Sequence, residues 1–202
     1  MLTTKEAIEQ RRSIRKFKRE PVPDEIIMSL LEAARLAPSG SNAQPWRFKV
    51  VKDKETKFKL SQAAYNQLFI ADAPVVLVCC ADIKGYLDGT ASGVQDLGKI
   101  GAIEDRIMNI ILERVSNLNT ANIEPLGDRI ALNVAIAIEH IVLRALDFGI
   151  GSCWIRLVNE QMIKDIFGWN DNFYVVALLP IGYPAESPPA RKRLKLEKII
   201  ID

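Results

Sequence analysis

The sequence has a single histidine, His140, and three cysteines among its 202 residues. A Ser-His-Asp or Cys-His catalytic centre would have to use His140, and the chain has no G-x-S-x-G nucleophile motif. Metal sites need clustered ligands, which neither the cysteines nor the lone histidine provides. We therefore expect no metal site, and we expect His140 to be a structural residue that is hydrogen-bonded to a nearby carbonyl group.

Long apolar runs are also missing. The longest one, from Ala73 to Ala81, is too short to cross a bilayer. The first residues, MLTTKEAIEQRR, lack the apolar core of a signal peptide. Cys79 and Cys80 are poor disulfide partners, because neighbouring residues of a strand point to opposite faces. These features predict a cytoplasmic protein without a membrane partner.

Two common nucleotide-binding fingerprints are absent as well. Gly149 and Gly151 begin like the dinucleotide motif G-x-G-x-x-G, but Trp154 occupies the third glycine position. There is no phosphate loop of the form G-x-x-x-x-G-K-[ST]. With so few groups for acid-base or nucleophilic chemistry, either the chain is not an enzyme or a bound cofactor supplies the reactivity.

Positive charge, in contrast, is concentrated in two places. The N-terminal basic segment, Arg11 to Arg19, has six bases and no acid, and the C-terminal basic segment, Arg191 to Lys198, has five bases and one acid. Since the net charge is +2, the rest of the chain carries −8. A nucleic-acid-binding protein spreads its positive charge along a face or groove, so we expect no nucleic-acid partner. Two compact basic segments suit a small anion such as a phosphate group, or they are solvated surface.

Hydrophobic patterning predicts one α+β domain over residues 1–202. Helices are expected at residues 4–10, from Asp24 to before Pro38, at residues 129–149 and from about Asn159. Strands are expected at residues 46–53, 73–82, 150–155 and 173–183, and the valine-rich second strand should be covered on both sides.

The middle and the end of the chain give weaker patterns. Five glycines between Gly85 and Gly101 indicate a loop, and a short amphipathic helix with Ile107 and Ile110 on one side follows it. We expect residues 85–127 to form a variable lid or insertion. Residues 187–202 begin with prolines and end in an apolar run, so we expect a C-terminal tail that reaches a partner subunit.

Two polar stretches could bind a ligand. In an extended backbone Arg11, Ser13 and Arg15 share one face, and forked arginine donors with a hydroxyl group suit a phosphate dianion. After the predicted end of the second helix, hydroxyl and amide groups suited to the edge of a flat heterocycle come from Ser39, Ser41, Asn42 and Gln44. The same residues would also make an ordinary turn into a strand.

Several motifs together resemble those of the flavin-dependent nitroreductase family. They are RRSIRKF (11–17), EAARLAPSGSNAQPWRF (32–48), GIGSCWI (149–155), LLPIGYP (178–184) and a terminal Arg-x-Arg. Their order and spacing match over essentially the whole chain except residues 85–127. The resemblance implies an α+β sandwich with a mostly antiparallel central sheet flanked by helices. It also implies a domain-swapped homodimer with two FMN sites at the interface.

The resemblance further implies which residues bind FMN. On the phosphate side these are Arg11, Arg12, Ser13, Arg191 and Arg193. Arg15 matches the cation at the pyrimidine edge of the flavin, where a guanidinium stabilises the charge of the reduced ring. The loop that reaches the flavin from the opposite subunit comprises Pro38, Ser39, Ser41, Asn42 and Gln44. Asn66 matches a contact to the ring edge, and the backbone of Trp154 and Ile155 lies near flavin N5.

The sequence departs from the family soon after Trp154. Family members usually have a glycine there, whereas this chain has Arg156 and Leu157. Arg156 would either contact an anionic acceptor beside the reacting face of the flavin or point to solvent.

The implied function is that of an NAD(P)H-dependent FMN oxidoreductase. Hydride passes from the nicotinamide to flavin N5, and then to a small acceptor such as a nitroaromatic or a quinone that binds in the same place. This ping-pong reaction needs no catalytic side chain, which agrees with the scarcity described above. The same fold also hosts dehalogenases, azoline oxidases and flavin-destroying enzymes, and a non-catalytic FMN-binding protein is a further alternative.

Overall fold

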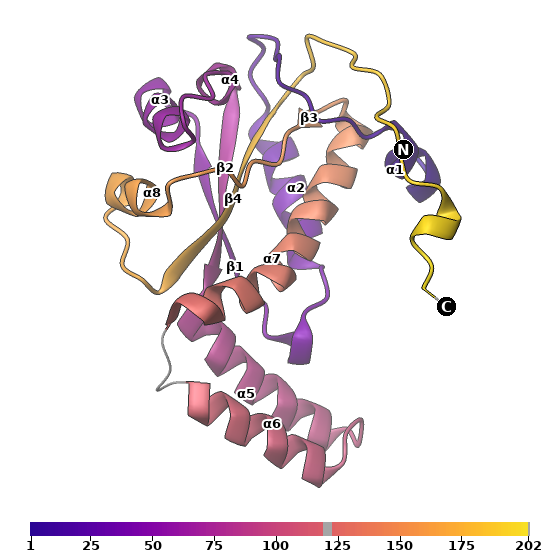
Figure 1. The fold of residues 1–202 in the computed structure, drawn as a ribbon, viewed down its shortest axis with the longest axis vertical. Helices are drawn as coiled ribbons and strands as arrows, with labels where there is room; N and C mark the ends of the chain where they lie inside the picture. Colours follow the sequence, from indigo (N-terminus) through magenta and orange to yellow (C-terminus); the bar gives the residue numbers. More distant parts are fainter. Residues whose placement is uncertain (119–122, 202) are drawn as a thin grey trace.

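Four strands form one antiparallel sheet in the structure, a computed structural model that describes residues 1–118 and 123–201 (Figure 1). The strands are β1 (Trp46–Val51), β2 (Val75–Asp82), β3 (Gly151–Ser152) and β4 (Phe173–Gly182). Their order across the sheet is β1-β2-β4-β3, and every neighbouring pair is antiparallel. The expected antiparallel central sheet is therefore confirmed.

Helices cover both faces of this sheet, so the expected sandwich is also confirmed (Figure 1). One face packs against α2 (Asp24–Arg35) and α7 (Ile123–Ala145), and the other against α3 (Lys54–Ala63), α4 (Phe69–Asp72) and α8 (Glu160–Phe167). Side chains of a strand alternate between its two faces, and β2 feeds both cores. Leu77 belongs to the first core and Val78 to the second, each fully buried.

Three further α-helices lie outside these two layers. They are α1 (Thr4–Gln10), α5 (Ile83–Lys99) and α6 (Asp105–Leu118). Short 3-10 helices are η1 (Gly40–Asn42), η2 (Leu146–Phe148) and η3 (Leu196–Lys198). The helix α1 begins with a reciprocal capping box, in which the Thr3 side chain accepts from the Glu6 backbone N–H and Glu6 accepts from the Thr3 backbone N–H.

The prediction of a loop after Gly85 is wrong, because α5 runs through four of the glycines (Figure 1). A glycine inside a helix costs about 1 kcal/mol relative to alanine. Here tight packing requires it: a Cβ on Gly89 would lie 2.4 Å from the Ala43 carbonyl oxygen, and one on Gly93 would lie 1.7 Å from the Ser41 carbonyl oxygen. The amphipathic helix that follows is confirmed as α6. Residues 119–122 of the predicted lid lie outside the described residues.

The predicted strand at residues 150–155 is shorter than expected. Ser152 faces Ile181, and Ile155 faces Leu178 in the same antiparallel register, but only Gly151–Ser152 is strand. Cys153 donates its N–H to the Pro180 carbonyl oxygen at 3.2 Å. Proline has no N–H to return that bond, so the ladder is interrupted at this position.

The central helix starts earlier than predicted, since α7 begins at Ile123 rather than near residue 129. It is followed by η2, and Gly149 ends the turn in the left-handed conformation with φ 66°. None of the helices in the described ranges combines the length and the hydropathy of a membrane span. Cys79, Cys80 and Cys153 are all buried and free.

Candidate functional site

The N-terminal basic segment is hydrogen-bonded to β3 and to the residue that follows β4. The Ile14 N–H donates to the Ser152 carbonyl oxygen at 2.9 Å, and Ser13 forms an isolated bridge with Ser152. Further along, the Lys18 N–H donates to the Tyr183 carbonyl oxygen at 2.8 Å. The segment is thus an extended strand-like arm, in which Ile14 is buried while Ser13 and Arg15 are not.

Gly151 makes this arrangement possible. A Cβ at this position would lie 2.5 Å from Cγ1 of Ile14. The glycine that resembles part of a dinucleotide fingerprint therefore provides space for the arm instead.

Glu186 fixes the middle of the arm, a role that no motif or spacing in the sequence indicates. Its Oε1 accepts hydrogen bonds from the backbone N–H groups of Arg15 at 2.5 Å and Lys16 at 3.0 Å. One carboxylate oxygen thus binds the backbone amides of two successive residues. Glu186 therefore orients the backbone and leaves the Arg15 guanidinium free. A separation of 171 residues hides this contact from any local pattern.

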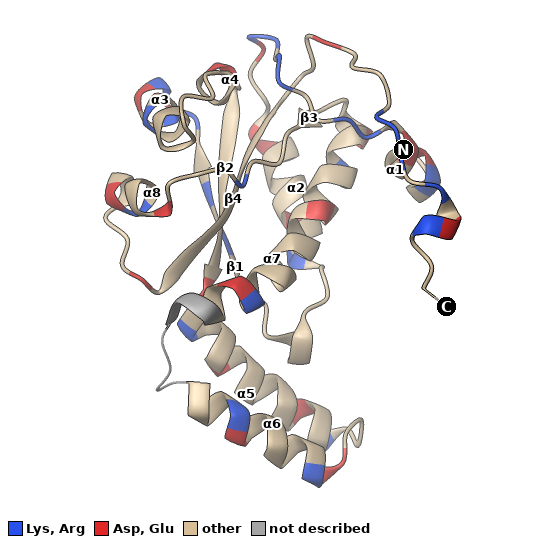
Figure 2. Cartoon of the chain, viewed as in Figure 1, with Lys and Arg blue, Asp and Glu red and all other residues tan. Residues whose placement is uncertain are grey.

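Both basic segments line one cavity with a volume of about 730 Å³. Its lining has six cations and a single acid, Glu9, which makes it strongly positive. Figure 2 shows the Lys and Arg positions along the arm and on the tail beside α1. The predicted FMN residues that the structure brings together here are Arg11, Arg12, Ser13, Arg15, Arg191 and Arg193.

Most of these arginines are free to bind an anion. Within residues 1–118 and 123–201, no ion pair or side-chain hydrogen bond engages the guanidinium groups of Arg11, Arg15, Arg191 and Arg193. Arg12 differs, because its Nη1 donates to the carbonyl oxygens of Glu9 at 2.7 Å and Arg11 at 2.8 Å. It therefore caps the end of α1 and contributes less to the cavity.

The loop at residues 38–44 is strained. Ser41, Asn42 and Gln44 have φ angles of 50°, 52° and 48°. Residues other than glycine rarely adopt this left-handed backbone conformation. Each such residue costs about 1 kcal/mol or more of folding free energy. The strain is held by specific bonds: the Gln44 N–H donates to Ser39 Oγ at 3.0 Å, and the Gly40 N–H to Asn133 Oδ1 at 3.0 Å.

Strain of this kind concentrates at ligand clamps. Non-glycine residues with positive φ in the described part of the chain are Ser41, Asn42, Gln44, Tyr65 and Asn66. Four of these five are predicted FMN residues. The predicted loop thus contains three of these left-handed residues, at Ser41, Asn42 and Gln44.

The loop and the cavity are separate within one chain. The residues that line the cavity include none from 38–44, nor Asn66, nor Trp154 and Ile155. The loop instead packs on α5, where Gly89 and Gly93 approach it. Within one chain, the predicted basic residues therefore lie together in the cavity, and the polar loop lies elsewhere.

Trp154 and Ile155 follow β3 and run beside β4, where Ile155 bridges Leu178. Ile155 exchanges two backbone hydrogen bonds of 3.0 Å with Leu178, which fixes the backbone just before Arg156. The Arg156 side chain is half exposed, and its Nη2 lies 3.7 Å from Asp128 Oδ1 near the start of α7. It is therefore neither buried nor directed wholly to solvent.

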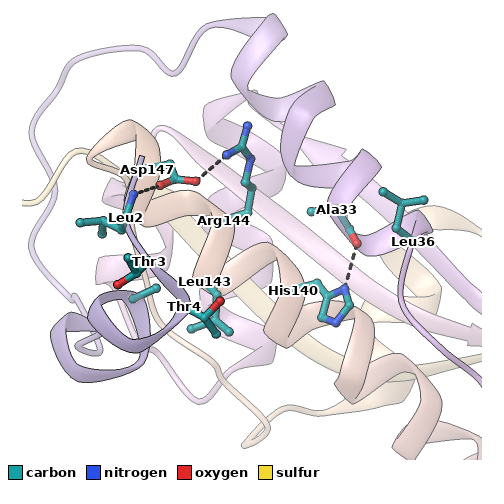
Figure 3. Close-up of a pocket in the computed structure, with 10 residues that line it drawn as sticks. Leu2, Thr3, Thr4, Ala33, Leu36, His140, Leu143, Arg144 and Asp147 are labelled. Atoms are coloured by element: carbon teal, nitrogen blue, oxygen red, sulfur yellow. Dashed lines mark hydrogen bonds and ion pairs between the residues drawn. The ribbon is translucent and has the colours of Figure 1, made fainter.

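A second cavity, of about 330 Å³, lies between α1, α2 and α7 (Figure 3). His140 borders it, and its Nδ1 is 3.1 Å from the Ala33 carbonyl oxygen, which confirms the predicted structural role. Asp147 accepts from the Leu2 N–H at 2.7 Å and pairs with Arg144 at 2.5 Å, so this wall anchors the N-terminus. In the described ranges, no group of three His, Cys, Asp or Glu side chains could hold a metal ion.

Comparison with known proteins identifies the family of this chain. A family model described as "Nitroreductase family" matches residues 8–183. The NADH dehydrogenase of Thermus thermophilus is 31% identical over 201 residues, covering 100% of this chain and 96% of that protein. The FMN reductase (NAD(P)H) of Bacillus subtilis is 31% identical over 190 residues, covering 93% of this chain and 68% of that protein.

A solved structure has the same fold. The FMN-dependent nitroreductase of Clostridium difficile superposes with a TM-score of 0.69 at 25% identity, and the match covers 97% of each chain. Because the family model matches residues 8–183, which are most of this chain, the chain belongs to the nitroreductase family.

Proposed function

We propose that the chain is an NAD(P)H-dependent oxidoreductase with non-covalently bound FMN as its cofactor. The observation that carries this proposal is the cavity, where unpaired guanidinium groups from both ends of the chain converge. Forked arginine donors are well suited to a phosphate group. The names of the two relatives, an NADH dehydrogenase and an FMN reductase, support the same chemistry.

The residues present fit FMN. Arg11, Ser13, Arg191 and Arg193 would hold the phosphate, with Arg12 shaping the end of α1. Arg15 would lie at the pyrimidine edge of the flavin, and a fixed guanidinium there stabilises the negative charge of the reduced ring. When bound, FMN supplies the capacity to accept hydride from NAD(P)H and to pass it to an acceptor in a ping-pong cycle. The net reaction with a quinone consumes NAD(P)H and one proton and yields NAD(P)⁺ and the hydroquinone.

The FMN site would be completed by a second copy of the chain. The strained polar loop, Pro38 to Gln44, lies away from the cavity and would contact the flavin of the partner. Large apolar side chains that are each at least 60% exposed support such a homodimer: Leu132, Leu194, Leu196, Ile199, Ile200 and Ile201. Burying one of them stabilises an interface by about 1.5–3 kcal/mol. We propose that residues 187–202 pack on the partner subunit in a domain-swapped dimer.

The acceptor would be a small aromatic molecule such as a nitroaromatic or a quinone. The hairpin of α5 and α6 projects from the body of the molecule, and Ile107 and Ile110 on α6 are more than 40% exposed (Figure 1). We propose that this hairpin is the lid over the acceptor. A reducing, cytoplasmic location suits the three free cysteines.

Glu186 offers a test of the arm. In Glu186→Ala, the amides of Arg15 and Lys16 lose their acceptor, so the arm should loosen and the Kd for FMN should rise about tenfold. Glu186→Gln keeps a carbonyl acceptor and should recover most of the affinity. The flavin reduction potential should also fall in Glu186→Ala, because Arg15 would be less well placed. FMN fluorescence titration and a dye-coupled potential measure the two effects.

The matched control is Glu20→Ala, which removes the same charge from an exposed position near the arm. If Glu186→Ala binds FMN with the affinity of the Glu20→Ala protein, the positioning role is wrong.

The function itself is tested by an anaerobic titration of the FMN-loaded protein. NADH or NADPH should bleach the flavin absorbance, and a quinone or nitroaromatic should restore it. Bound FMN that neither nicotinamide reduces would instead identify a non-catalytic FMN-binding protein. Protein that fails to bind FMN would refute the proposal.

A further inference from the structure

The Arg156 side chain makes one long ion-pair contact, and its hydrogen-bond donors stay available to a ligand. Its Nη2 lies 3.7 Å from Asp128 Oδ1, which is an ion-pair distance but too long for a hydrogen bond. Within residues 1–118 and 123–201 its guanidinium donates no hydrogen bond to a side chain or carbonyl group. A half-exposed arginine with five free N–H donors is well prepared to bind a carboxylate in the bidentate manner.

Asp128, the counter-ion of Arg156, also accepts a hydrogen bond from another residue. The Tyr174 hydroxyl donates to the same oxygen, Asp128 Oδ1, at 2.7 Å. Burial and this carboxylate raise the pKa of Tyr174 to about 12, so the hydroxyl group stays protonated near neutral pH. Asp128 is therefore shared, and its stronger bond goes to Tyr174. Glu160 is the other acid near this cluster, and it forms an ion pair with Lys164 at 3.0 Å.

The cluster is built into the packing of the fold. A Cβ on Gly127 would lie 2.4 Å from the Tyr174 ring, so the start of α7 fits closely against β4. This contact fixes Asp128 beside the hydroxyl group. On the other side, the two backbone bonds between Ile155 and Leu178 fix the residue that precedes Arg156.

Arg156 also follows the segment that contacts the phosphate-binding arm, four residues after Ser152. Ser13 bridges Ser152, and although the strand ends there, the chain stays beside β4 in unchanged register as far as Ile155. Four residues of extended chain span about 13 Å. A ligand with its phosphate near Ser13 and its ring along this segment would therefore bring the ring toward Arg156.

We propose that Arg156 is a specificity-determining residue that favours acceptors with a carboxylate or another acidic group, and that Asp128 competes with the acceptor for it. This inference rests on the proposed function. An anionic acceptor would take the free N–H donors and displace the weakly held Asp128. A neutral acceptor would gain nothing from the cation.

The test compares 4-nitrobenzoate with the neutral 4-nitrobenzyl alcohol as acceptors of the FMN-loaded enzyme. In Arg156→Ala, kcat/KM should fall about tenfold for the anion, which is the low end expected for a half-exposed charge-assisted hydrogen bond, and change less than twofold for the alcohol. Asp128→Asn should act in the opposite direction and raise kcat/KM for the anion severalfold, since it removes the competing carboxylate. Arg35→Ala is the matched control, because Arg35 is also an exposed arginine in an ion pair, with Glu32.

A binding measurement separates this inference from the proposed function. Benzoate, which is not reduced, is titrated into the oxidised FMN-loaded protein and followed by the shift of the flavin absorbance. Its Kd should rise about tenfold in Arg156→Ala and fall in Asp128→Asn. This readout works even if NAD(P)H fails to reduce the flavin. Equal losses for the anion and the alcohol, or an unchanged benzoate Kd, would overturn the role of Arg156.

Discussion

Replacing Arg11 and Arg193 together by alanine is expected to raise the Kd for FMN by a hundredfold or more. Each hydrogen bond to a charged group contributes about 1.5–3 kcal/mol, and the two arginines come from opposite ends of the chain to one cavity. Neither forms an ion pair among the described residues. Burial raises the pKa of Glu139 and the charge of Arg11 opposes that rise, so the loss of Arg11 removes a stabilising charge from this carboxylate. Fluorescence quenching of free FMN measures the change.

The control for this experiment is the double variant Arg35→Ala and Lys59→Ala. It removes the same charge from exposed ion pairs with Glu32 and Glu55 on α2 and α3. Its FMN affinity should stay near that of the unaltered protein. If both double variants bind FMN equally well, the cavity does not hold the phosphate.

Replacing Gly93 by alanine is expected to destabilise the protein by about 3 kcal/mol, at the upper end of the range for overpacked positions. The new Cβ would lie 1.7 Å from the Ser41 carbonyl oxygen, so either α5 or the strained loop must move. For a chain of this size the melting temperature should fall by about 6–12 °C. The displaced loop should also weaken FMN binding.

Gly98 provides a matched control in the same helix. A Cβ there would lie 3.0 Å from the sulfur of Met108, a flexible side chain that can shift. Gly98→Ala should therefore be neutral or stabilising, because alanine favours the helix. Equal melting temperatures for the two variants would contradict the close contact between α5 and the loop.

Elements with a strong local pattern could be predicted from the sequence. The valine-rich strand β2 and the amphipathic helix α2 appear where expected, since their burial follows directly from side-chain periodicity. The helix α5 could not be predicted in this way. Its glycines are typical of loops, and the reason for Gly89 and Gly93 is a contact with a loop far earlier in the chain.

The same distinction holds for the strand after Gly149. Its early interruption depends on Pro180, which faces Cys153 only once the register of β4 is known. The residues from 150 to 155 alone therefore could not predict where the pairing with β4 stops.

The candidate site also has residues that could be predicted from the sequence and others that could not. The motif around Arg11 and Ser13 predicted a phosphate site, and the structure places both in one cavity with Arg193. Glu186 was missed because its partners are backbone amides, which carry no residue-specific signal. The positive φ angles of Ser41 and Gln44 were also invisible, since neither residue type is typical of that conformation.

The central claim is that one FMN site uses the basic segments of one chain and the polar loop of another. Mixed dimers test it most directly. One chain would carry Arg11→Ala and Arg193→Ala, and the other Ser39→Ala and Asn42→Ala, with different affinity tags to purify the mixed species. Each parent should bind FMN much more weakly than the unaltered protein and lose it during purification.

In the mixed dimer, one site combines intact basic segments with an intact loop, and the other combines both defects. We therefore predict one FMN for every two chains, measured by flavin absorbance after purification. Mixed dimers that form but bind no FMN, or a monomer that binds FMN by itself, would contradict the shared site.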